Sequence, residues 1–322
     1  MAEKLKFAFY WAASCGGCEV AVLDIDAKLL DVVKVADIVF WPCAMDFKYK
    51  DVEAMEDDYI DVCFYNGAVR NSEQEYLAHL LRRKSRVMVA FGSCACFGGI
   101  PGLANLFTKD EIMSRQYLET PTTVNPDRIL PQPSYQAPEG ELTIPVFYDE
   151  VKALGQVVPV DYYIPGCPPP PDLIVAAVEA IATGNLPPAP AVIAGNKTVC
   201  DECPREKAEK IVAEFKRVHE VIPDEKTCLL EQGIICCGPG TRSGCGAQCL
   251  QVNMPCRGCF GPPEHVTDQG AKLLSAITSI MDADDPEQVE IITESIPDPA
   301  GTFYRFALPV SLLEKIHVAE VK

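Results

Sequence analysis

Positive charge is scarce in this chain of 322 residues. Lysine and arginine number 28 against 46 aspartates and glutamates, which gives a formal net charge of −18 at pH 7. We find no basic stripe that could neutralise the phosphates of a nucleic acid. The same charge disfavours binding to an anionic membrane surface. The composition therefore argues against nucleic-acid and membrane-surface proteins, and it is compatible with docking onto basic protein partners.

Long apolar runs and export signals are also lacking. No stretch reaches the ~18–20 residues that a membrane span requires. The apolar run at 7–13 is too short and too aromatic for the core of a signal peptide, and no twin-arginine pair accompanies it. The four histidines show no metal-ligand spacing. We therefore expect a cytoplasmic protein without a membrane span.

Cysteine, in contrast, is abundant. There are 16 cysteines, and nine of them lie between Cys200 and Cys259. In a short secreted chain this number would indicate disulfides. Here C-x-x-C pairs recur beside an α/β pattern, which favours metal ligation in a reducing compartment. The segment 200–259 is rich in glycine and proline, so we expect metal-bound thiolates rather than an apolar core to hold it. It has no acidic residue between Cys237 and Cys259 but contains Arg242 and Arg257, which suits an anionic cluster.

Strand and helix patterns alternate in the first part of the chain. Apolar runs predict β-strands at 4–11, 36–41, 60–65, 86–91 and 160–164, and helical spacing predicts helices over 19–33, 72–84 and 171–183. This alternation is typical of a parallel sheet with helices on both faces. We therefore expect an α/β, flavodoxin-like domain over residues 1–188.

The rest of the chain reads differently. A loop-rich iron–sulfur segment is expected over 189–265, with one helix at 205–221. A C-terminal tail over 266–322 is expected to pack on the rest, with a helix at 265–281 and a strand at 302–308. Six prolines within 119–147 predict an ordered excursion or a contact surface rather than a helix.

Four cysteines follow predicted strands of the sheet. Cys15 and Cys18 come after the first strand, Cys94 after the fourth and Cys167 after the fifth. Because the carboxyl ends of parallel strands meet at one edge, we expect these four thiols to converge there. Neighbouring glycines such as Gly92 would let the backbone approach a metal and donate N–H groups to sulfur. The pattern therefore predicts one site of four thiolates.

The C-terminal cysteines offer two more sets of four. One set lies within 15 residues and comprises Cys245, Cys249, Cys256 and Cys259. The other set comprises Cys200, Cys203, Cys228 and Cys236, and Cys237 could replace Cys236 because the two are adjacent.

Four motifs stand out as a group. They are Cys15-Gly-Gly-Cys-Glu19, Gly92-Ser-Cys-Ala-Cys-Phe-Gly-Gly99, Pro165-Gly-Cys-Pro-Pro169 and Cys256-Arg-Gly-Cys-Phe-Gly-Pro262. Together they resemble the small subunit of [NiFe] hydrogenases, and the likeness runs through most of residues 4–263. The run from Cys228 to Cys245 is similar to the cytoplasmic group, which includes the F420-non-reducing hydrogenases of methanogens.

The resemblance implies three [4Fe–4S] clusters. The proximal ligands would be Cys15, Cys18, Cys94 and Cys167. The medial ligands would be Cys245, Cys249, Cys256 and Cys259. The distal ligands would be Cys200, Cys203, Cys228 and Cys236, with Cys236 preferred over Cys237. Exported relatives carry histidine at the position of Cys200, and many carry proline near that of Cys249, so two cysteines here favour four irons in each cluster.

The resemblance also implies partners. A separate large subunit would carry the nickel–iron site and split H2. Electrons would pass through the three clusters to an iron–sulfur or flavin protein, with heterodisulfide reductase or ferredoxin as the candidate acceptor. The chain would thus be an oxidoreductase subunit with no catalytic residue of its own.

Alternative interpretations remain for the function of the chain and for the roles of individual residues. A single-cluster quinone-reductase subunit would share the first-domain motifs, and C-x-x-C pairs also hold structural zinc in non-redox scaffolds. Cys63 fits a small core residue, and packing is favoured over ligation for Cys43 and Cys96. Glu19 is either an acid favoured by the first turn of a helix or a proton-transfer group at the large-subunit interface.

Overall fold

The computed structural model describes residues 4–208, 211–283 and 285–314. Its centre is a six-stranded parallel sheet in the order β10-β9-β5-β3-β1-β2. The strands are β1 (Leu5–Trp11), β2 (Ala36–Phe40), β3 (Ile60–Asn66), β5 (Ser85–Phe91), β9 (Tyr162–Ile164) and β10 (Ala191–Val192). The five predicted strands are confirmed, and β10 is an addition at the edge.

Alternating side chains along each strand face two separate cores. From β1, Phe7 and Phe9 join the core beneath α1 (Gly17–Leu23), α2 (Leu29–Val35) and α7 (Pro171–Thr183). Ala8 and Tyr10 join the opposite core beneath α3 (Tyr49–Glu53), α4 (Ser72–Lys84) and α5 (Ser93–Phe97). This period of two on a sheet covered on both faces confirms the predicted α/β fold.

The predicted helix at 19–33 is two helices. A 3-10 turn at Asp26–Lys28 separates α1 from α2, and Asp26 has a φ of 54°. An α-helix cannot run through a residue with a left-handed backbone, so the chain changes direction there. The apolar spacing predicts a single helix because the two short helices α1 and α2 both pack their apolar side chains on the same face of the sheet.

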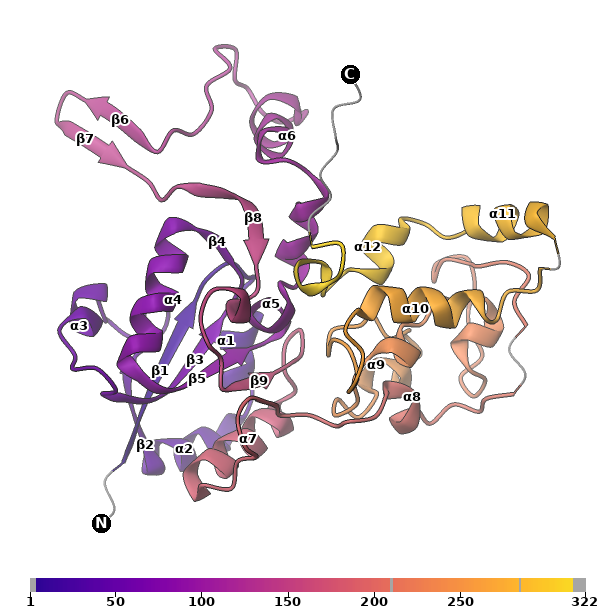
Figure 1. Cartoon of the computed structure of the whole chain (residues 1–322), viewed down its shortest axis with the longest axis horizontal. Coiled ribbons are helices and arrows are strands. Elements are labelled where there is room, and N and C mark those ends of the chain that lie inside the picture. The colour runs from indigo at the N-terminus through magenta and orange to yellow at the C-terminus, as the bar shows by residue number, and fades with distance from the viewer. Residues whose placement is uncertain (1–3, 209–210, 284, 315–322) are drawn as a thin grey trace.

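The proline-rich excursion leaves the sheet after α6 (Lys109–Ser114) and contains no helix from residue 120 to 147. Its middle forms an antiparallel hairpin of β6 (Ser134–Ala137) and β7 (Gly140–Thr143), which extends away from the body of the protein (Figure 1). The chain returns along β8 (Phe147–Lys152), which pairs with β4 (Val69–Asn71). The prediction of a non-helical excursion is confirmed.

The C-terminal part lies beside the sheet and has short helices joined by loops (Figure 1). These are α8 (Val199–Glu202), α9 (Gln248–Gln251), α10 (Gln269–Thr278), α11 (Pro286–Glu294) and α12 (Pro299–Phe303). They surround a buried core that includes Leu229, Leu250 and Ile277. The expectation that no apolar core holds this segment is therefore wrong, because residues after 268 supply apolar helices that cover the cysteine loops.

The predicted helix at 205–221 is also wrong within the described residues of that segment. Backbone N–H groups in this segment donate hydrogen bonds to carbonyl groups far away in the sequence instead of to the preceding helical turn. The N–H of Val212 donates to Ile280 O at 2.8 Å and that of Lys216 to Gly233 O at 2.7 Å. The predicted strand at 302–308 is wrong too, since α12 ends at Phe303 and a 3-10 turn begins at Leu308.

The two parts meet along one seam. The N–H of Gly99 donates to Phe306 O at 3.0 Å, and the ring of Pro309 packs on Gly98. Across the same seam the hydroxyl of Ser93 donates to Cys259 O at 2.5 Å. The predicted domain boundaries after residues 188 and 265 stay predictions. Among the described residues, no helix combines the length and apolarity that crossing a bilayer requires.

Candidate functional site

Four thiols gather at the carboxyl edge of the sheet. Cys15 lies in the loop after β1 and Cys18 in α1, while Cys94 lies in α5 after β5 and Cys167 follows β9. Burial raises the pKa of the Cys18 thiol, and the thiols of the other three raise it further. Burial and then Cys167 and Cys15 raise the pKa of Cys94 to about 12. The four groups are therefore near one another, and their role as ligands stays a prediction.

The backbone makes room for these sulfurs. Gly92 has a φ of 85°, and a Cβ there would lie 2.3 Å from the sulfur of Cys18. Gly99 has a φ of 59°, and its Cβ would lie 2.5 Å from the sulfur of Cys94. Both positions need glycine for backbone conformation and for space. The N–H of Gly17 also donates to the Cys15 sulfur at 3.4 Å. Such close, N–H-rich surroundings suit thiolates bound to an iron–sulfur cluster.

A second group of thiols touches the first. Burial raises the pKa of Cys259 to about 12, and the thiols of Cys167, Cys245 and Cys249 add to this, while the backbone N–H of Cys167 donates to the Cys259 sulfur and lowers it. Cys259 is thus near Cys167 and also near Cys245 and Cys249. The structure brings together three of the four predicted medial ligands.

The fourth predicted medial ligand has different neighbours. Burial raises the pKa of Cys256, and the nearest thiols acting on it are Cys236 and Cys237. The sulfurs of Cys236 and Cys200 flank Gly238, where a Cβ would lie 3.6 Å and 3.1 Å from them. Of the predicted distal ligands, Cys200 and Cys236 are thus together. Cys228 is buried in the surrounding core, and Cys203 packs against that core.

Hydrogen bonds distinguish Cys236 from Cys237. The backbone N–H groups of Gly238 and Cys256 donate to the sulfur of Cys236, and burial still raises its pKa to about 12. Burial raises the pKa of Cys237 to about 11, and the positive charges of Arg257 and Arg305 oppose this rise. Because N–H donors stabilise a cluster-bound sulfur, the geometry favours Cys236 as the ligand.

This difference gives a direct test. We expect Cys236→Ser to lower the iron content by about four atoms per chain, because it removes one ligand of a four-iron cluster. Cys237→Ser should keep all the iron. Iron analysis and EPR spectra of both variants check this, and the opposite pattern would assign the ligand to Cys237.

Polar side chains that the sequence did not single out brace the cysteine loops. Arg205 is only 5% exposed and donates to the carbonyls of Asp224 at 2.7 Å and Thr227 at 2.9 Å. Arg242 donates to the carbonyls of Gly195 at 2.9 Å and Pro262 at 3.1 Å. These arginines donate to backbone carbonyl groups of the loops that no helix or strand partner satisfies. In the sequence, only the richness of this segment in glycine and proline indicates that side chains must supply hydrogen bonds to its backbone.

Of the thiols predicted to pack rather than bind metal, Cys63 and Cys96 are buried, whereas Cys43 is exposed. Cys63 is fully buried in β3. The thiol of Cys96 donates to Ala90 O at 3.3 Å. Cys43 is exposed and donates to Glu19 Oε2 at 3.5 Å.

Glu19 is a buried acid, with 5% of its surface exposed. Its carboxylate accepts hydrogen bonds from the indole N–H of Trp41 and, at 3.4 Å, from the amide of Asn66. Burial raises its pKa, and these bonds oppose the rise. Trp41 and Asn66 follow or end strands β2 and β3, so the same sheet edge that carries the thiols also holds this carboxyl group. The sequence alone did not reveal its partners.

The four thiols at the carboxyl edge of the sheet have the chemistry that an iron–sulfur cluster requires of its ligands. Buried thiols that raise one another's pKa lose their protons readily only beside a cation, and iron supplies that positive charge. The glycine cradles and N–H donors fit the same group. The neighbouring thiols do not form a closed set of ligands around one point, because among the described residues no three His, Cys, Asp or Glu side chains are placed to hold a single metal ion.

Known proteins resemble the chain over nearly its whole length. Residues 15–181 match the family described as NADH ubiquinone oxidoreductase, 20 Kd subunit. The iron-sulfur subunit of an F420-non-reducing hydrogenase from Archaeoglobus profundus is 45% identical over 97% of this chain and 98% of its own length. The corresponding subunit of the F420-non-reducing hydrogenase from Methanothermobacter thermautotrophicus is 40% identical over 97% of both chains.

A solved structure agrees with these relatives. A chain in the crystal structure of an NAD+-reducing [NiFe]-hydrogenase in the H2-reduced state superposes with a TM-score of 0.50 and 27% identity, over 58% of this chain and 96% of that one. The chain is an oxidoreductase subunit, and it belongs to the hydrogenase small-subunit family that includes the iron-sulfur subunits of the F420-non-reducing hydrogenases.

Proposed function

We propose that the chain is the electron-transfer subunit of a cytoplasmic [NiFe] hydrogenase and that it holds three [4Fe–4S] clusters. The proximal ligands would be Cys15, Cys18, Cys94 and Cys167. The medial ligands would be Cys245, Cys249, Cys256 and Cys259, and the distal ligands Cys200, Cys203, Cys228 and Cys236. When bound, the clusters would supply one-electron carriers between a large subunit and an acceptor such as heterodisulfide reductase.

One observation carries the proposal. Cys259 lies within reach of both the sheet-edge thiols and the C-terminal thiols, and the N–H of Cys167 donates to its sulfur. Electron transfer between the proximal and medial clusters requires a short distance, and Cys259 and Cys167 would bring the two sites into contact. The chain's own residues would position the clusters, donate N–H groups to sulfur and limit solvent access, which together set reduction potentials.

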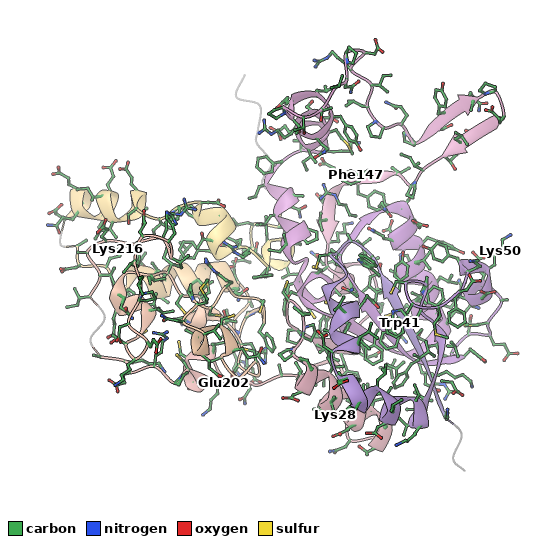
Figure 2. The ribbon with its side chains drawn as sticks, turned by 180° about the vertical axis from the view of Figure 1, so that it is seen from behind. Lys28, Trp41, Lys50, Phe147, Glu202 and Lys216 are labelled. Carbon is green, nitrogen blue, oxygen red and sulfur yellow. The ribbon has the colours of Figure 1, made fainter. Side chains whose placement is uncertain are left out.

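The carboxyl edge of the sheet supports a large-subunit partner. Several large apolar side chains remain exposed around Cys15 and Glu19, namely Trp11 at 44%, Val20 at 56%, Met45 at 45% and Ile100 at 45%. Figure 2 shows Trp41, the indole that binds Glu19, within this part of the molecule. An apolar surface beside buried polar groups suits a stable subunit contact. Such a contact would cover the exposed thiol of Cys15.

The alternatives use fewer of these residues. A single-cluster quinone-reductase subunit would need only the thiols within 15–181, the part that the family match covers. The likeness to the Archaeoglobus profundus subunit extends over 97% of the chain, so it covers the segment 200–259 that the quinone-reductase alternative leaves without a role. A zinc-stabilised scaffold would not need glycines as close to sulfur as Gly92 is to Cys18 and Gly99 is to Cys94. The relay is therefore the function that the geometry favours.

The metal content of anaerobically purified protein tests the proposal. We expect about twelve irons with matching acid-labile sulfide per chain, as three four-iron clusters require. Nickel should appear only when a larger subunit co-purifies. Stoichiometric zinc without labile sulfide would contradict the proposal, and about four irons would support the quinone-reductase alternative.

A further inference from the structure

A basic pocket of about 220 Å³ opens on the C-terminal part of this acidic protein. Its lining includes Lys216, Arg217, His219, Arg257 and Arg305, and one acid, Asp298. Figure 2 shows Lys216 on the C-terminal part, far from Lys28 and Lys50, which lie in helical elements beside the sheet. Five basic side chains around one hollow contrast with the net charge of −18.

The positive charge of the pocket is only weakly neutralised. Asp298 caps α12, and its carboxylate accepts the N–H of Gly301 at 3.0 Å. Lys216 lies 3.8 Å from the exposed Glu214. Within the described residues, Arg217, Arg257 and Arg305 form no ion pair with a carboxylate. The Nε of Arg305 is buried and has no hydrogen-bond partner there. A guanidinium Nε that is buried without an acceptor carries an energetic cost, and an anionic group in the pocket would offset it.

The inner wall of the pocket is the backbone that carries candidate cluster ligands. Ile235 directly precedes Cys236, and Arg257 directly follows Cys256. The N–H of Cys237 donates to Cys256 O at 3.0 Å and joins these two stretches. The charges of Arg257 and Arg305 also act on the Cys237 thiol. A group that enters the pocket therefore comes close to the predicted distal site.

We propose that this pocket is the docking site for an acidic electron-acceptor protein, with a carboxylate of that protein entering beside Arg257 and Arg305. The inference rests on the proposed relay function and names the surface where electrons leave. The net charge alone suggested basic partners. An acidic partner would be repelled by most of the surface and attracted at this pocket, so the charge pattern would select one orientation.

The residues divide the work of docking. Lys216, Arg217 and His219 are exposed at the rim and would attract the partner over a distance. Arg257 and Arg305 are half-buried beside the cysteine loops and would hold the carboxylate once it has entered. A guanidinium binds a carboxylate through two parallel hydrogen bonds, which fixes the partner's position as well as its affinity.

The test uses the complex with its large subunit and an acidic two-cluster ferredoxin as the probe. H2-dependent reduction of the ferredoxin is compared with that of a cationic viologen dye. The pocket variant is Lys216→Glu with Arg217→Glu, which reverses two exposed rim charges. The control is Lys28→Glu with Lys50→Glu, which reverses two exposed charges on the sheet part (Figure 2).

We expect the KM for ferredoxin to rise about tenfold or more in the pocket variant and less than about twofold in the control. The wild-type KM should rise with salt, and the pocket variant should lose this dependence. Viologen reduction and iron content should be unchanged in both. The conservative pair Lys216→Arg with Arg217→Lys should restore the wild-type KM.

Three results would overturn the inference. Equal rises in KM for the pocket variant and the control would show a general charge effect. Loss of iron and of viologen reduction in the pocket variant would show that these cations serve cluster binding instead of docking. A wild-type complex without iron or without H2-dependent viologen reduction would refute the proposed function itself, which the first two results leave intact.

Discussion

Cys259→Ala is expected to lower the iron content from about twelve to about eight atoms per chain and to abolish H2-dependent reduction of a protein acceptor. The Cys259 sulfur accepts the N–H of Cys167 and lies near the thiols of Cys245 and Cys249. Its loss would remove a ligand from the middle of the path. It would also loosen the cysteine loops, because metal binding and folding are coupled in such segments.

The measurements are iron and sulfide content, EPR and the midpoint of thermal unfolding. Cys63→Ala is the control, since Cys63 is a fully buried thiol inside β3 and belongs to none of the proposed ligand sets. It should keep all the iron. Iron loss in the Cys63 variant, or full activity in the Cys259 variant, would show that the ligand sets are wrong.

Gly92→Ala should have an effect of similar size without removing any sulfur. Gly92 has a φ of 85° and a ψ of 163°, a conformation that costs other residues about 1–3 kcal/mol. The added Cβ would lie 2.3 Å from the Cys18 sulfur, so that sulfur would have to move. We expect loss of about four irons per chain and of all H2-dependent electron transfer, because the proximal site is the entry point.

Gly184→Ala is the control for backbone strain alone. Gly184 ends α7 with a φ of 67°, and a Cβ there would meet nothing within 4 Å. This substitution should cost about 1–2 kcal/mol of folding free energy and leave the iron content unchanged. Retention of all iron by the Gly92 variant would contradict the proposed closeness of backbone and cluster sulfur.

The sheet could be predicted from the sequence because its signals are local. The central residues of strands β1, β3 and β5 are apolar runs, and the chain reaches Cys15 four residues after β1 and Cys94 three residues after β5. The gathering of Cys15, Cys18, Cys94 and Cys167 follows from parallel topology alone. The motif resemblance then indicated the family, which the full-length relatives confirm.

The C-terminal part could not be predicted in the same way because its order depends on distant partners. Val212 and Phe215 have helical spacing, yet Val212 bonds to Ile280 and the N–H of Phe215 donates to the hydroxyl of Ser295. No local sequence pattern predicts a hydrogen bond between residues some 70 to 80 positions apart. The same holds for the buried Glu19 of α1, whose partners are Trp41, just after β2, and Asn66, the last residue of β3.

The seam between the two parts has a consequence for how substitutions combine. Ser93 and Cys167 on the sheet side both bond to Cys259 on the other side, through its carbonyl and its sulfur. A change at any of these residues alters the environment that the others experience. The effects of paired substitutions across the seam should therefore depart from additivity, and double-mutant cycles that combine Cys259 with Ser93 or with Cys167 would measure this coupling.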